Sequence, residues 1–64
     1  MPNATVTILR ENPDGTEFLT VVVDERYEEV VNAYDEGDNP IALTPDEERF
    51  AVRMVRMGLF DDED

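Results

Sequence analysis

Most of the side chains in this sequence that could do chemistry are carboxylates, and the others are five Arg, five Thr and two Tyr. The 64 residues include 17 Asp and Glu and no His or Cys. A Ser–His or Cys–His nucleophile pair and a Cys/His zinc site therefore cannot be built. Two carboxylates can act as acid and base across a cleft, but so small a domain leaves little room for a pocket of a few hundred Å³. We therefore expect a protein that is not an enzyme.

One acidic segment loosely resembles a calcium-binding loop. It reads Asp-Glu-Gly-Asp-Asn over residues 35–39. An EF-hand needs oxygen ligands at positions 1, 3 and 5, Gly at position 6 and Glu at position 12. Counting from Asp35 places Gly37 at position 3 and Pro40 at position 6, so the spacing fails. The sequence predicts no metal site and no cofactor.

The negative charge is concentrated in two segments. The formal net charge is −12, of which residues 24–39 contribute −6 and residues 59–64 contribute −4. If residues 25–36 form a helix, the seven acids from Asp24 to Asp38 span about 21 Å, or about one acid per 3 Å. One DNA strand carries a phosphate about every 3.4 Å along the axis, a similar mean charge density. The sign of the charge excludes a basic nucleic-acid-binding face.

Two simpler explanations of the acidity stay open. The acids can form an ordinary solvated helix face, as runs of charge often do. All five basic residues are Arg and the isoelectric point is near 4.1, which also fits a GC-rich genome or a cytoplasm with molar salt. Adaptation to salt predicts carboxylates over every surface, whereas residues 40–58 are neutral. The clustering is therefore the feature that favours a functional explanation.

The first part of the chain predicts a β-hairpin. Residues 4–11 and 16–23 alternate in the two-residue period of strands. Between them, Asn12-Pro13-Asp14-Gly15 is typical of a type I turn followed by a Gly bulge, since Pro presets one turn position and Gly accepts positive φ. Both faces of the second strand are apolar, so one can cover a helix layer while the other meets a partner.

Two helices are expected after the hairpin. Asp24 can cap a helix over residues 25–36 that ends at Gly37, with Tyr27, Val30, Val31 and Tyr34 on one stripe. Residues 41–43 can add a short third strand. Thr44-Pro45-Asp46-Glu47 has the spacing of a capping box, so a second helix should run to Met57 and end at Gly58.

The predicted architecture is an α+β domain: a β-hairpin, with or without a short third strand, followed by two α-helices packed on one sheet face. It occupies residues 1–60, and residues 61–64 form an acidic C-terminal tail. A rival is a β-grasp arrangement, in which residues 49–57 supply a strand. The capping signal at Thr44 and the helical spacing of Arg49, Arg53 and Arg56 favour the helix.

The second predicted helix carries two further features. Arg49, Arg53 and Arg56 form a narrow basic stripe, which we interpret as structural: it pairs with Asp46, with the first helix or with the tail. Met54, Met57, Leu59 and Phe60 are interpreted as core rather than interface.

A domain of this size buries only about 60% of its unfolded surface, and the uncompensated charge adds self-repulsion. We therefore expect a monomer or a small homo-oligomer of marginal stability. The first twenty residues do not resemble a signal peptide, and Val21-Val22-Val23 is far too short to cross a bilayer. The expected location is the cytoplasm, with no membrane partner.

The size and the placement of charge resemble those of phage-encoded DNA-mimic inhibitors of the anti-CRISPR type. The likeness is at the level of the class, covers about half the chain and includes no diagnostic motif. It implies an inhibitor that occupies the site where target DNA would enter, in the host cytoplasm if the protein is phage-encoded. The arginines of residues 49–56 depart from this pattern.

The predicted function is non-enzymatic inhibition. The protein would bind the basic nucleic-acid-binding groove of a protein partner, such as a CRISPR surveillance complex, without binding nucleic acid itself. The alternative is a small halophilic-type subunit or ubiquitin-like adaptor whose acidity serves solubility. The predicted partner-binding carboxylates are Glu25, Glu28, Glu29, Asp35, Glu36, Asp38, Asp61, Asp62, Glu63 and Asp64.

Overall fold

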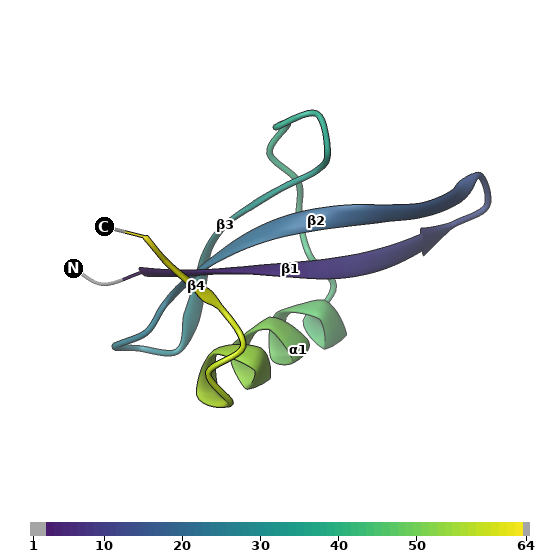
Figure 1. Ribbon diagram of the computed structural model, residues 1–64. Helices are drawn as coiled ribbons and strands as arrows, with labels where there is room; N and C mark the ends of the chain where they lie inside the picture. The colour runs from purple at the N-terminus through teal and green to yellow at the C-terminus, as the bar shows by residue number, and fades with distance from the viewer. Residues whose placement is uncertain (1–2, 64) are drawn as a thin grey trace.

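The computed structural model describes residues 3–63, with the side chains of residues 3–60. They form one antiparallel sheet and a single helix, α1 (Pro45–Arg56). The strand order in the sheet is β3 (Glu29–Tyr34), β2 (Gly15–Asp24), β1 (Asn3–Asn12) and β4 (Asp61–Glu63). The helix lies across one face of the sheet, and the far end of the β1–β2 hairpin projects beyond it (Figure 1). Since only one helix is present in residues 3–63, the predicted pair of helices on the sheet is wrong.

The hairpin is present as the turn sequence predicts. Strands β1 (Asn3–Asn12) and β2 (Gly15–Asp24) pair in a register that runs from Asn3 opposite Asp24 to Asn12 opposite Gly15. Pro13 and Asp14 form the turn, and Gly15 has a φ of +135°, which a residue with a side chain rarely adopts. The expected bulge beside the turn is not seen, because this register has no shift.

A strand replaces the first predicted helix. Residues 25–28 form a turn, and β3 (Glu29–Tyr34) pairs with β2. The carboxylate of Asp24 does accept the N–H groups of Arg26 and Tyr27, as a helix cap would, but Glu28 adopts a left-handed φ of 54° and stops any helix there. Val, Asn and Tyr are weak helix formers, and Val and Tyr favour strands.

A bulge explains why the spacing of apolar residues in β3 misled the helix prediction. Val22 lies opposite Asn32 while Val23 lies opposite Val30, so Val31 is an extra residue in the ladder. A strict two-residue alternation is lost at this point. The apolar residues then recur at three- and four-residue steps, which is also the pattern of a helix.

The second predicted helix is confirmed as α1 (Pro45–Arg56). The Thr44 hydroxyl accepts the Glu47 N–H at 3.2 Å, and the Glu47 carboxylate accepts the Thr44 N–H at 2.9 Å, which completes the capping box. After the C-cap Met57, Gly58 takes a φ of +78° and ends the helix. Because residues 49–56 are helical, the rival β-grasp arrangement is wrong.

Two connections complete the sheet. In the loop between β3 and α1, the Ile41 N–H donates to the Ala33 carbonyl at 3.0 Å, and Tyr34 forms an isolated bridge with Pro40. Residues 41–43 form no strand. At the other edge, the backbone of β4 (Asp61–Glu63) pairs with Asn3–Thr5 of β1. Most of the segment assigned to an acidic tail is thus an edge strand, and Asp64 lies outside the described residues.

The core lies between α1 and the facing side of β1, β2 and β3. Met54 and Phe60 pack partly buried against it, as predicted, whereas Met57 and Leu59 are more than half exposed. No helix in residues 3–63 is long and apolar enough to span a membrane. The buried core residues are Ala4, Val6, Ile8, Leu19, Val21, Val23, Ala33, Ala51 and Val55.

Candidate functional site

The most acidic segment of the chain forms one edge of the sheet. We call residues 24–39 the acidic edge; it comprises the β2–β3 turn, β3 and the loop that follows. Among the strands of residues 3–63, β3 has β2 as its single neighbour, so it is an edge strand. The segment keeps its net charge of −6, but its carboxylates do not share a helix face. They lie in two groups at the two ends of β3, about 20 Å apart along the strand.

The first group lies at the β2–β3 turn. It contains Glu25, Glu28 and Glu29. The Arg56 side chain donates to Glu28 from Nε at 2.6 Å and from Nη2 at 2.9 Å. These hydrogen bonds lower the pKa of Glu28 below its usual value and raise that of Arg56. Glu28 therefore joins the turn to α1, while Glu25 and Glu29 have no hydrogen-bond or ion-pair partner within residues 3–60.

The second group lies in the loop after β3. The Asp35 carboxylate accepts the N–H groups of Asn39 and Gly37, both at 2.9 Å, and the bond from Asn39 is the main cause of a lowered pKa of Asp35. Glu36 accepts the Phe18 N–H of β2 at 2.8 Å. Asp38, whose φ of 62° is left-handed, has an exposed side chain without a partner in residues 3–60.

The ten predicted partner-binding residues therefore divide into three sets. Glu28, Asp35 and Glu36 bind groups of their own chain, whereas the carboxylates of Glu25, Glu29 and Asp38 have no partner among the side chains and backbone of residues 3–60. Residues 61–63 lie on the opposite edge of the sheet, in β4, and their side chains, with Asp64, lie outside the described part. The structure thus does not bring the two acidic segments into a single cluster.

A groove runs between the acidic edge and α1, and we call it the edge groove. One hollow of about 560 Å³ lies beside the first half of β3, and a second of about 310 Å³ lies beside its second half and residues 40–43. Val30 and Glu48 line both hollows. The expectation that so small a domain leaves little room for a pocket of a few hundred Å³ is wrong, because the size of the groove depends on how far α1 stands from β3 and not on the length of the chain.

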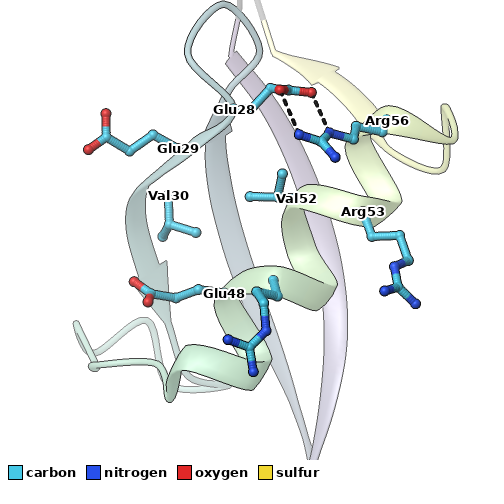
Figure 2. Close-up of a pocket in the computed structure, with 8 residues that line it drawn as sticks. Glu28, Glu29, Val30, Glu48, Val52, Arg53 and Arg56 are labelled. Carbon is cyan, nitrogen blue, oxygen red and sulfur yellow. Dashed lines mark hydrogen bonds and ion pairs between the residues drawn. The ribbon is translucent and has the colours of Figure 1, made fainter.

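Three arginines line the edge groove from the helix side. Arg49 pairs with Asp46 one turn earlier, as predicted, and Arg56 pairs with Glu28 of the acidic edge. The structural interpretation of the arginine stripe is therefore confirmed for these two residues. In Figure 2, Val30 and Val52 face each other across the hollow, and the Arg53 side chain points away from β3. Arg53 has no ion-pair partner in residues 3–60.

One strong ion pair was missed by the sequence analysis. Arg10 of β1 donates from Nε at 2.8 Å and from Nη2 at 2.6 Å to the Glu47 carboxylate, and Nη2 also reaches the Ala42 carbonyl. The hydrogen bond from Arg10 lowers the pKa of Glu47 to about 2. This pair holds the start of α1 against the hairpin. The two residues are 37 positions apart, so no local signal points to their contact.

The described residues contain no cluster of three or more acidic side chains arranged to hold a metal ion. No protein-family model, curated protein or solved structure matches this chain. The candidate site therefore rests on its own geometry. It consists of an open strand edge with free carboxylates and an adjoining groove.

Proposed function

We propose that this protein is a non-enzymatic acidic inhibitor. It binds the basic nucleic-acid-binding surface of a protein partner, such as a CRISPR surveillance complex, and blocks the binding of target DNA. The observation that carries the proposal is the acidic edge, which holds half of the net charge of −12 in 16 residues. Partner binding through opposite charge speeds association and favours a basic surface over other surfaces.

The backbone of the acidic edge supports this function because it is already ordered. Strand β3 is held by β2, and the two groups of acids are fixed by hydrogen bonds to Asp24 and Asp35. The free carboxylates of Glu25, Glu29 and Asp38 therefore extend from a fixed backbone. Binding then costs less conformational entropy than it would for a disordered acidic peptide.

Displacement of DNA tests the proposal. Purified DNA-binding effector complexes, CRISPR surveillance complexes among them, are incubated with labelled target DNA and increasing amounts of the protein, and the bound DNA is measured by electrophoretic mobility shift. A polyglutamate peptide with the same number of carboxylates is the matched control. We expect the protein to displace DNA from at least one complex at concentrations where polyglutamate does not. Equal effects of the two polyanions on every complex would contradict the proposal.

A second candidate function is supported by the face of the sheet that α1 does not cover. Leu9 and Phe18 lie directly opposite each other on that face and are both more than half exposed. An adaptor that binds a protein through these side chains would need its acidity only for solubility. Its binding would change little with salt and would be lost in the Leu9→Ser/Phe18→Ser variant, whereas binding through the acidic edge weakens as salt increases.

A further inference from the structure

The outer edge of β3 is only partly covered. Near its end, the Ala33 carbonyl accepts the Ile41 N–H, and just after it the Asp35 N–H donates to the Asn39 carbonyl. No backbone group in residues 3–63 pairs with the outer edge over residues 29–31. An open strand edge offers unpaired N–H and carbonyl groups to another extended chain.

The edge groove lies beside this open edge and has the length of a strand. Its two hollows are lined by residues from Glu28, in the turn before β3, to Ala33 within β3, and Val30 and Glu48 line both. Apolar side chains line it from three directions: Val30 from β3, Val52 from α1, and Ile41 and Leu43 from the loop between them. All four are partly buried against the core, so they form a firm surface on which an apolar side chain could pack.

The charges that remain unpaired in the edge groove are mainly negative. Arg56 is neutralised by Glu28 and Arg49 by Asp46. Glu29 and Glu48 have no partner within residues 3–60. In Figure 2 the Glu48 carboxylate lies near Val30, whereas the Glu29 side chain points away from α1 on the other side of β3. The Arg53 side chain points away from β3. The Glu48 carboxylate therefore lies beside the apolar surface, and the Glu29 carboxylate lies at the same open edge on the other face of the sheet.

We propose that the edge groove binds an extended, basic peptide segment of the partner, which adds to the sheet as a strand beside β3. The backbone of the segment pairs with residues 29–31, an apolar side chain packs on Val30 and Val52, and Arg or Lys side chains reach Glu29 and Glu48. This mode of binding gives affinity through main-chain hydrogen bonds and specificity through alternate side chains. It rests on the proposed function in one respect, namely that the partner is basic.

A second copy of this chain does not fit the edge groove. Pairing of two β3 strands would bring together two segments that each carry a net charge of −6. Like charges placed face to face across an interface destabilise it. The charge of the acidic edge therefore prevents pairing of edges between copies and selects an occupant of opposite charge.

A defined peptide tests strand addition without knowledge of the partner. The probe is an acetylated and amidated peptide of alternating Arg and Val, titrated into the ¹⁵N-labelled protein and followed by NMR. Two further versions are N-methylated on alternate residues, so that each lacks the N–H groups of one edge. We expect shifts concentrated in residues 29–31 and 48–52, and binding weakened about tenfold or more for one methylated version but not for the other. Equal binding of all three peptides would overturn strand addition.

Charge variants test the role of the two carboxylates. The Glu29→Arg/Glu48→Arg variant should bind the Arg–Val peptide about tenfold more weakly than the Glu11→Arg/Asp14→Arg variant, which makes the same change in net charge at the hairpin end. Equal affinities of the two variants, or equal binding of an alternating Glu–Val peptide by the unchanged protein, would overturn the assignment of a basic occupant.

The failures of the two proposals can be told apart. Displacement of DNA from an effector complex without peptide binding at residues 29–31 overturns strand addition and supports the proposed function. Edge-specific peptide binding without displacement of DNA from any complex supports strand addition and contradicts the proposed function.

Discussion

Glu47 has two kinds of partner at the start of α1. Its carboxylate accepts the Thr44 N–H inside the capping box and two hydrogen bonds from Arg10 of the hairpin. The side chains of Arg10 and Glu47 are only 25% and 18% exposed, unlike those of the ion pairs of Arg49 and Arg56. A partly buried bidentate pair is the kind of ion pair that contributes measurably to stability.

This pair predicts a pH-dependent stability that is specific to Glu47. Its pKa is about 2 in the folded state against 4.5 in an ordinary carboxyl, so its contribution is complete above pH 4.5 and is lost as the pH falls toward 2. The Glu47→Gln variant should be less stable than the natural protein by about 2 kcal/mol at neutral pH. The difference should shrink toward zero near pH 2. Urea unfolding of both proteins across this range measures it.

Acid changes the unfolding free energy of so highly charged a protein through all its carboxylates. Taking the difference between the natural protein and the Glu47→Gln variant removes this shared change. Protonation of the other carboxylates relieves repulsion in both proteins equally. A difference in unfolding free energy that stays constant between pH 6 and pH 2 would contradict the role assigned to the charge of Glu47.

Gly58 ends α1 in a left-handed backbone conformation. Its φ of +78° allows its N–H to reach the Val55 carbonyl at 3.1 Å and the Leu59 N–H to reach the Met54 carbonyl at 2.9 Å. The Gly58→Ala variant should lose about 1 kcal/mol of unfolding free energy, because a β-carbon is strained in this conformation. A β-carbon at Gly58 would meet no heavy atom within 4 Å. Any loss of unfolding free energy would therefore come from backbone strain and not from a clash with a neighbouring residue. An unchanged midpoint in urea would contradict this.

At the scale of elements, local signals account for the hairpin and α1 but not for β3. The turn at residues 12–15 and the capping box at Thr44 each act within a few residues, and the hairpin and the helix that they predict are confirmed, without the expected Gly bulge. Residues 25–36 have a helical spacing of apolar side chains, but β2 supplies partners for the backbone of β3 and buries Ala33. Only this non-local pairing decides between strand and helix.

For the candidate site, too, the sequence predicts the local feature but not the arrangement in space. The concentration of acid in residues 24–39 is a property of the sequence and was found there. Its division between the two ends of β3, the pairing of Glu28 with Arg56 and the edge groove all depend on the strand and on the position of α1. They follow from tertiary structure and have no local signal.

Isolated peptides test the difference between the two segments. A peptide of residues 44–58 should become helical in trifluoroethanol, because it carries its own capping box and helix end. A peptide of residues 24–39 should gain much less helix under the same conditions, since Val, Asn and Tyr disfavour it. Far-UV circular dichroism measures both. Equal helix content would show that β3 is a helix-forming sequence forced into the sheet.

For the molecule as a whole, the net charge and the elongated shape both lower the free energy of unfolding. The molecule measures 35 × 20 × 17 Å, and the hairpin end extends beyond the helix that covers the core (Figure 1). A net charge of −12 is spread over this small, elongated body. Self-repulsion of this size destabilises the compact state and is screened by salt.

We nevertheless expect the protein to be folded at low salt. Far-UV circular dichroism in about 0.1 M KCl should already show the folded state, because repulsion between charges more than about 10 Å apart is largely screened at this salt concentration. In about 2 M KCl the remaining repulsion is screened within a few Å, so the unfolding free energy should rise only modestly. A chain that is unfolded in the lower salt and folds only in the higher would identify the acidity as an adaptation to salt.

The proposed inhibition depends on contact between the free carboxylates of the acidic edge and a basic nucleic-acid-binding surface. The most direct measurement compares DNA displacement from the same effector complex by two variants that each lose three negative charges. Glu25→Gln/Glu29→Gln/Asp38→Asn changes the acidic edge, and Glu11→Gln/Asp14→Asn/Glu17→Gln changes the hairpin end. We predict that half-displacement needs about tenfold or more of the first variant and less than about twofold more of the second, relative to the natural protein. An equal loss of DNA displacement in the two variants would contradict this role of the acidic edge.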